Sequence, residues 1–436
     1  MERRRNVFVM GLDPFNQQQL ESLRHADEFR FHPLVRRESL RTGGEISIEE
    51  LLSRSEEELR AFEGSVDAIV GYWDFPVSTL LPIVRRRMDL PTPSLEAVLR
   101  CEHKYWSRLE QQRSIPDHIP DFCAVDPFAE DVRSRIELSF PFWIKPVKSV
   151  LSHLGFCVHD AQELDRAIER IREGIAHFGD PFNEILEHAE LPEEIAGIDG
   201  NHCLVESLIS QGRQCTLEGY VLRGEVVVYG VVESIREGEK QSCFARYQYP
   251  ARLPSDVIER MTEITTRLMK SIGFDGSPFN VELYWNEQDD RIWLLEINPR
   301  ISKSHCPLFK KVDGEFHHQV MIDVALGETP RMPRREGEFE IAAKFMWRRY
   351  GDAIVHHVPS KDERESLCRR IPGLELDLHV EEGMRLSDMR YQDSYSYEIA
   401  ALFLGGQSEQ ELERHYEECR AALDLDFEEI SGSDGS

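Results

Sequence analysis

Apolar and polar positions change period several times along the chain, and each change predicts a different element. From residue 6 to residue 93, short apolar runs alternate with amphipathic stretches, which is typical of an α/β layer. The elements predicted in this layer are strands at 6–12 and 66–73 and helices at 17–25 and 46–62. Ser47 and Glu50 have the spacing of a capping box at the start of the last helix.

The pattern beyond this layer predicts further strands and helices in mixed order. A helix at 94–112 follows Pro91-Thr92-Pro93, and a helix at 255–273 keeps its apolar residues on one face, as core helices do. The other predicted elements are strands at 140–144, 203–209, 342–349 and 398–406 and a C-terminal helix that begins at Ser408 and is capped with Glu411. The chain is thus predicted to be a multidomain protein of α/β and α+β parts.

The most informative pattern is the segment 279–300, FNVELYWNEQDDRIWLLEINPR, which predicts two strands around the polar turn 286–290. Glu282 points away from the apolar face of the first strand. Alternation in the second strand predicts one face that carries Ile292, Leu294, Glu296 and Asn298 and an opposite face that carries Trp293, Leu295 and Ile297. Because both faces are mostly apolar, this strand is predicted to be covered on both sides.

Two carboxylates among apolar residues indicate a cation. An unpaired buried carboxylate is costly, and two that face each other raise one another's pKa unless a cation lies between them. Glu282, Glu296 and Asn298 offer hard oxygen ligands, which suit Mg²⁺ or Mn²⁺ rather than Zn²⁺ or copper. The alternative is a hairpin whose acids face water.

Composition excludes several classes of function. The 436 residues include 52 basic and 80 acidic ones, and the net charge of -28 disfavours nucleic acid and anionic membranes as partners. Nine cysteines without a C-x-x-C pair predict a cytoplasmic protein, and no apolar run is long enough for a membrane span. The turn at 11–15 lacks the second and third glycines of a dinucleotide site, which excludes a redox cofactor there.

The segment LLEINPR, with Glu282 before it, resembles the metal-binding strands of the ATP-grasp superfamily, which includes biotin carboxylases, D-alanine:D-alanine ligases and L-amino-acid ligases. The resemblance implies that Glu282, Glu296 and Asn298 hold Mg²⁺ (or Mn²⁺) with ATP. It also implies that Arg300 contacts the acyl phosphate. Several motifs in family order extend the resemblance over about 94–330.

The same resemblance implies a nucleotide site. It assigns phosphate contact to Lys104 and Lys145, although a lone lysine on a helix is more often solvated surface. The residues that it assigns to the rest of the nucleotide are Ser149 and Ser152 in the phosphate-covering loop, Glu206 and Leu208 along the adenine, and Gln214 where many relatives have a ribose-binding Glu. The loop 147–155 departs from the family because it is poor in glycine, so an ordinary surface loop stays an alternative, as does an exposed edge-strand acid for Glu206.

Three further residues are predicted to face the substrate. Arg246 lies among aromatic residues, and Lys303 and His305 follow the proposed metal site closely in sequence. For His305, a polar loop residue is the alternative.

The resemblance also predicts the domains and the reaction. An ATP-grasp fold is expected, with a Rossmann-like N-terminal domain at 1–93, ATP-grasp subdomains at 94–202 and 203–336, a C-terminal α+β lobe at 337–430 and a disordered tail at 431–436. The implied reaction is ADP-forming amide or peptide bond formation between a small-molecule carboxylate and an amine, and the resemblance allows a homodimer. A biotin-carboxylase-like enzyme and a non-catalytic ATP-binding regulator are the alternatives.

Overall fold

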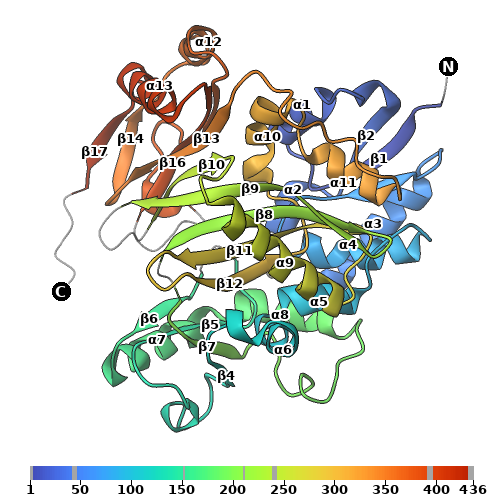
Figure 1. Ribbon diagram of the computed structural model, residues 1–436, viewed down its shortest axis with the longest axis vertical. Coiled ribbons are helices and arrows are strands. Elements are labelled where there is room, and N and C mark those ends of the chain that lie inside the picture. The colour runs from blue at the N-terminus through green and yellow to red at the C-terminus, as the bar shows by residue number, and fades with distance from the viewer. Residues whose placement is uncertain are drawn as a thin grey trace. The chain divides into compact units, whose positions relative to one another are not determined.

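The computed structural model describes residues 3–41, 47–150, 153–209, 212–237, 243–389 and 396–430, and the chain divides into two compact units (Figure 1). Unit 1 comprises residues 1–231, 253–303 and 317–332, and unit 2 comprises residues 232–252, 304–316 and 333–436. The predicted disordered tail at 431–436 lies outside the described residues. The division into four domains stays a prediction.

The N-terminal part of unit 1 is the predicted α/β layer, with three parallel strands in the order β2, β1, β3. Its elements are β1 (Arg5–Met10), α1 (Pro14–Glu21), η1 (Ala26–Glu28), β2 (Phe29–Leu34), α2 (Arg37–Arg41), α3 (Ile48–Ala61), β3 (Ala68–Val70) and α4 (Val77–Arg87). The side chain of Ser47 accepts a hydrogen bond from the backbone N–H of Glu50, which is half of the predicted capping box. Asp13 caps α1 in the same way.

The helix predicted at 94–112 is two helices, α5 (Leu95–Glu102) and α6 (Lys104–Ser114). The buried His103 separates them: its backbone is extended (ψ 97°), and its Nδ1 accepts a hydrogen bond from the backbone N–H of Trp106 at 3.1 Å. The single-helix prediction is wrong because a histidine is the cap, outside the usual Ser, Thr, Asp and Asn. As a result, Lys104 lies in the first turn of a helix.

A second sheet of unit 1 is antiparallel, with the strand order β4, β7, β5, β6. Its elements and their neighbours are η2 (Pro116–His118), β4 (Phe122–Val125), η3 (Arg133–Arg135), β5 (Phe142–Pro146), β6 (Phe156–Val158), α7 (Ala161–Gly174), α8 (Ala176–Leu186) and β7 (Cys203–Ser207). The apolar face of α7 packs into one core with β5 and β7, in which Phe142, Ile144 and Val205 are fully buried. The strand predicted at 203–209 is confirmed as β7.

The remaining strands of unit 1 follow the order β12, β11, β8, β9, and β9 continues into unit 2. The elements are β8 (Arg213–Leu222), β9 (Glu225–Glu237), α9 (Ser255–Ser271), β11 (Ser277–Asn286), β12 (Arg291–Asn298), η5 (Lys303–His305) and α11 (His318–Ala325). Helix α9 crosses these strands (Figure 1) and buries Val257, Met261 and Leu268, so its prediction as a core helix is confirmed.

Unit 2 contains the end of β9 and a sheet in the order β9, β10, β13, β16, β15, together with the separate pair β14 and β17. Its elements are β10 (Cys243–Tyr249), α10 (Cys306–Asp313), β13 (Ile341–Arg349), β14 (Ala353–His357), α12 (Lys361–Arg370), β15 (Glu375–Leu378), η6 (Leu386–Asp388), β16 (Tyr397–Gly406), α13 (Glu409–Ala422) and β17 (Asp426–Glu429). Ser408 caps α13 by accepting from the N–H of Glu411, as predicted. None of the helices in the described ranges combines the length and apolar content that a membrane crossing requires.

Candidate active site

Strands β11 and β12 place the two predicted metal-binding acids opposite each other. Glu282 pairs with Glu296, and the next pair on the same face is Asn280 with Asn298. The amide Nδ2 of Asn298 donates to Asn280 Oδ1 at 2.9 Å and reaches Glu282 Oε1 at 3.5 Å. Four oxygen-bearing side chains are therefore gathered on one face of the hairpin.

A β-bulge in β12 produces this arrangement. Leu283 of β11 pairs with Leu294, but its neighbour Glu282 pairs with Glu296, so Leu295 is skipped. The skip shifts all later residues to the opposite face. The prediction that Ile292, Leu294, Glu296 and Asn298 share one face is therefore wrong, because strict alternation cannot foresee an inserted residue.

The donor set fits a hard divalent cation. Carboxylate and amide oxygens are the ligands that Mg²⁺ and Mn²⁺ prefer, and Mg²⁺ is commonly held by one or two carboxylates together with substrate phosphates. Among the described residues, no group of three His, Cys, Asp or Glu side chains could hold a metal ion by itself. A cation at Glu282 and Glu296 would thus need oxygens from a ligand as well.

Gln214 lies beside this acidic pair. Its Nε2 donates to Glu282 Oε2 at 2.9 Å, and its Oε1 accepts from the hydroxyl of Tyr284 at 2.8 Å. These bonds fix a carboxylate oxygen of Glu282, so the buried Gln214 orients a candidate metal ligand. Its assignment to the ribose stays a prediction.

Lys104 links the start of α6 to the acidic pair. Its Nζ lies 3.3 Å from Glu296 Oε1 and donates to the carbonyl oxygen of Ser149 at 2.9 Å. The lysine side chain is only 10% exposed, which does not fit a solvated surface lysine. The break at His103 is the reason that this ammonium group reaches β12.

Lys145 and Glu206 form a buried ion pair with Arg108. Lys145 Nζ lies 2.7 Å from Glu206 Oε2, and the other oxygen of Glu206 accepts from Arg108 Nε. Glu206 lies on the inner strand β7 with its side chain 5% exposed, so the alternative of an exposed edge-strand acid is wrong. Both carboxylate oxygens of Glu206 are therefore bonded within the protein, and its assignment to the adenine stays a prediction.

Electrostatics in this cluster favour the charged forms of the acids. Burial raises the pKa of Glu206, but Arg108 and Lys145 outweigh it and lower the pKa to about 2. Burial likewise opposes ionisation of Glu296, and the nearby lysines, Lys104 foremost, lower its pKa. Lys145 behaves differently, because burial lowers its pKa more than the attraction of Glu206 raises it.

A third lysine, Lys148, was missed by sequence reasoning. Its ammonium is buried, forms an ion pair with Glu102, and lies 5.2 and 5.6 Å from the ring centroids of Phe75 and Phe182. Its charge also contributes to the lowered pKa of Glu296. The only signal in the sequence was its place three residues after Lys145, in the loop predicted to cover phosphates.

Three other residues are predicted to contact the nucleotide, and the structure describes two of them, Ser149 and Leu208. The carbonyl of the buried Ser149 accepts from Lys104, whereas Ser152 lies outside the described residues. Leu208 follows the end of β7 and is 38% exposed, which leaves its surroundings open to a ligand. These assignments stay predictions.

Arg300 lies just beyond β12 and binds Asp74. Its Nε donates to Asp74 Oδ1 at 2.6 Å, and its Nη1 donates to the carbonyl of Ile301 at 3.1 Å. Burial favours the neutral guanidine, but the charge and hydrogen bonds of Asp74 outweigh it and raise the pKa of Arg300. Asp74, in the loop after β3, therefore holds a charged guanidinium close to the end of β12.

The three predicted substrate residues are spread over both units. Lys303 lies in unit 1 with its Nζ 4.0 Å from the ring centroid of Trp73, a cation–π contact. Within unit 2, Arg246 pairs with Glu409 at 2.7 Å, which favours a structural role for it. The buried His305 packs edge-on against Tyr247, with 5.2 Å between the ring centroids.

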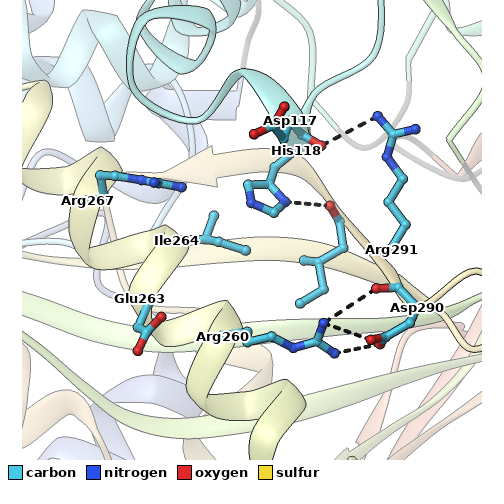
Figure 2. Close-up of a pocket in the computed structure, with 9 residues that line it drawn as sticks. Asp117, His118, Arg260, Glu263, Ile264, Arg267, Asp290 and Arg291 are labelled. Carbon is cyan, nitrogen blue, oxygen red and sulfur yellow. Dashed lines mark hydrogen bonds and ion pairs between the residues drawn. The ribbon is translucent and has the colours of Figure 1, made fainter.

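A hollow of about 740 Å³ lies elsewhere on unit 1, between η2, α9 and the turn that joins β11 to β12 (Figure 2). Arg260 and Asp290 form an ion pair there, and Ile264 provides an apolar wall. None of the predicted site residues lines this hollow. It is therefore separate from the acidic pair and the lysines.

Comparison with known proteins bears on the family. Residues 138–307 match the family described as ATP-grasp domain. The chain is 24% identical over 324 residues to the uncharacterized protein y4rH of Sinorhizobium fredii, which covers 72% of this chain and 60% of that protein. It is 22% identical over 242 residues to the C-terminal section of the carbamoyl phosphate synthase large chain of Methanopyrus kandleri. This alignment covers 55% of this chain and 40% of that protein. The chain thus spans 60% or less of the length of these curated relatives.

A similar solved structure supports the fold. The L-amino acid ligase from Bacillus licheniformis superimposes with a TM-score of 0.74 over 98% of this chain and 100% of that chain, at 16% sequence identity. A likeness at this identity is a likeness of fold. The chain therefore has the ATP-grasp fold, and its residues 138–307 are similar to the ATP-grasp domain.

Proposed function

We propose that this protein is an ADP-forming ligase that joins a small-molecule carboxylate to an amine through an acyl phosphate. The observation that carries the proposal is the pairing of Glu282 with Glu296 next to Lys104, since hard metal ligands and a phosphate-binding cation then lie within one site. The fold likeness to an L-amino acid ligase supports it.

In this proposal, Glu282, Glu296 and Asn298 hold Mg²⁺ (or Mn²⁺), which when bound would neutralise charge on the phosphates of ATP. Lys104 and Lys145 contact the phosphates from α6 and β5. Lys148 is buried beside Glu102 and adds positive charge near the same Glu296. The other proposed nucleotide contacts are Ser149, Ser152, Glu206, Leu208 and Gln214.

Arg300 has the role of stabilising the acyl phosphate. An arginine stays protonated throughout the working pH range, and the hydrogen bond to Asp74 holds this guanidinium in place. Lys303 and His305 are proposed to contact the substrates, as is Arg246 despite its pairing with Glu409. The chemistry attributed to the protein is positioning and charge neutralisation rather than covalent catalysis.

We also propose that the protein acts in the cytoplasm, because all nine cysteines are free thiols, as a reducing compartment requires. A homodimer is expected from the resemblance, and its mass in solution would test this. We propose no nucleic-acid or membrane partner, because the net charge of -28 repels both.

The decisive experiment is phosphate release by the purified protein across a matrix of amino acids and small carboxylates, with nucleotide products separated. We expect ADP and phosphate only when a carboxylate and an amine are both present. With ¹⁸O in the carboxylate, one label is expected in the released phosphate.

Other outcomes would each contradict the proposal in a different way. AMP and pyrophosphate would indicate adenylation. Turnover that requires bicarbonate and biotin would indicate a carboxylase, and nucleotide binding without turnover under any pair would indicate a regulator. Glu296→Gln protein serves as the control for contaminating ATPase activity.

A further inference from the structure

Arg108 is a buried arginine on α6 that the proposed reaction does not use. Its guanidinium donates to the carbonyl oxygens of Leu294 at 3.1 Å and Leu295 at 2.9 Å, and it also bonds to Glu206 and Gln111. The side chain is 2% exposed. The guanidinium of Arg108 is therefore hydrogen-bonded both to the bulge of β12 and to Glu206, the carboxylate that pairs with Lys145.

The bulge needs such a partner because β12 is the edge strand of its sheet. A bulge leaves one residue without a ladder partner, and a buried carbonyl group without a hydrogen bond destabilises the fold. Arg108 supplies donors to the skipped Leu295 and to the residue before it.

The same segment of chain holds β12 at a second point. His118 of η2, which follows α6, donates from Nδ1 to the carbonyl of Ile292 at 2.9 Å, and the backbone carbonyl of Asp117 accepts from the side chain of Arg291 at 3.5 Å (Figure 2). The length of β12 between Ile292 and Leu295 is thus hydrogen-bonded to side chains of α6 and η2. Its register is set from this side as well as by β11.

The consequence of the bulge for the metal ligands is geometric. If Leu295 were not skipped, the register at Leu294 would place Glu296 opposite Val281, which is fully buried on the apolar face. With the bulge, Glu296 faces Glu282. The bulge is therefore the feature that brings the two carboxylates together.

We propose that Arg108 is a positioning residue, which holds the bulge of β12 and thereby sets the distance between the carboxylates of Glu282 and Glu296. The proposal rests on the proposed function in one respect, namely that a divalent cation and a nucleotide bind there. Through Glu206, the same guanidinium ties this geometry to the proposed phosphate contact Lys145.

The test uses Mn²⁺ and ADP as probes on the full-length protein. Two variants alter Arg108: Arg108→Lys retains the charge but loses the planar guanidinium donors, and Arg108→Met removes the donors and leaves Glu206 paired with Lys145. Arg113→Met is the matched control, since Arg113 lies on the same helix and is half-exposed, and its ion pairs with Glu110 and Glu194 do not involve β12.

We expect both Arg108 variants to fold, by circular dichroism and thermal unfolding, and to bind Mn²⁺ in the presence of ADP about 10- to 100-fold more weakly, the usual effect of losing a residue that orients metal ligands. ADP binding measured in EDTA should change much less. Arg113→Met should match the wild type in both measurements.

Wild-type Mn²⁺ affinity in either folded variant would overturn the proposal. Loss of the fold in both variants would also overturn it, because Arg108 would then be a structural residue and no more. The proposed function fails separately: a wild-type protein that binds Mn²⁺ and ADP but releases no phosphate would refute the ligase and leave the positioning result standing.

Discussion

Replacing Glu206 with Gln should lower the stability of the protein by an amount that depends on pH. The carboxylate of Glu206 is buried between Arg108 and Lys145, and Gln has nearly the same shape without the charge. The change therefore leaves two buried cations without their common partner, a type of loss that is strongly destabilising.

The magnitude follows from the pKa of Glu206. Folding lowers this pKa from 4.5 to about 2, which corresponds to about 3 kcal/mol of stability at pH 7. Because the folded-state pKa is the lower one, this contribution is complete above pH 4.5 and is lost as the pH falls toward 2. The difference between wild type and variant should thus be about 1 kcal/mol smaller at pH 4 than at pH 7.

Urea unfolding at pH 7 and pH 4 would measure this difference. The control is Glu194→Gln. Glu194 pairs at the surface with Arg113, which lies on α6 as Arg108 does, so this substitution should lower the free energy of unfolding by about 0.5 kcal/mol or less at either pH. A stability gap for Glu206→Gln that is absent at pH 7, or that does not shrink at pH 4, would refute the reasoning.

Three further substitutions test the site and its scaffold. Glu296→Gln should reduce turnover at least about 100-fold at saturating Mg²⁺ in a protein that still folds, and near-normal phosphate release would contradict the metal assignment. Lys148→Met should destabilise the fold by about 3 kcal/mol or more, because it removes the cation that pairs with the buried Glu102. Urea unfolding would measure this against Lys270→Met, a substitution of an exposed lysine, and equal midpoints would contradict the prediction. Gly219→Ala should lower the thermal midpoint by several degrees, since an added Cβ would lie 2.4 Å from the ring of Phe279 and 2.7 Å from the backbone oxygen of Val227; an unchanged midpoint would contradict this.

Helices and strands were easier to predict from the sequence than the bulges and breaks within them. The hairpin that carries Glu282 and Glu296 was predictable because alternation and turn residues are local properties. The bulge at Leu295 was not, since its stabilising partner Arg108 lies 187 residues away. The break before Lys104 was hidden for a similar reason, because it depends on the fold that buries His103.

The role of a charged residue was harder to predict than its position. Glu206 is predicted to bind adenine, and the structure shows that its two oxygens are also bonded to Arg108 and Lys145, which the sequence does not indicate. Lys148 resembles any surface lysine in the sequence, and only the packing of Phe75 and Phe182 shows that it is buried. Burial of a charge is a property of the tertiary structure, so no local pattern records it.

The ion pair between Lys104 and Glu296 makes cation and nucleotide binding interdependent under the proposed function. The carboxylate of Glu296 cannot bind the ammonium of Lys104 and a divalent cation equally well. When a divalent cation binds Glu296, the ion pair with Lys104 weakens, and the ammonium can then bind a phosphate. Binding of one ligand would then lower the free energy needed to bind the other, and thermodynamic reciprocity requires the benefit to be the same in both directions. The protein would thus respond steeply to the joint concentration of cation and nucleotide, and only weakly to either one alone.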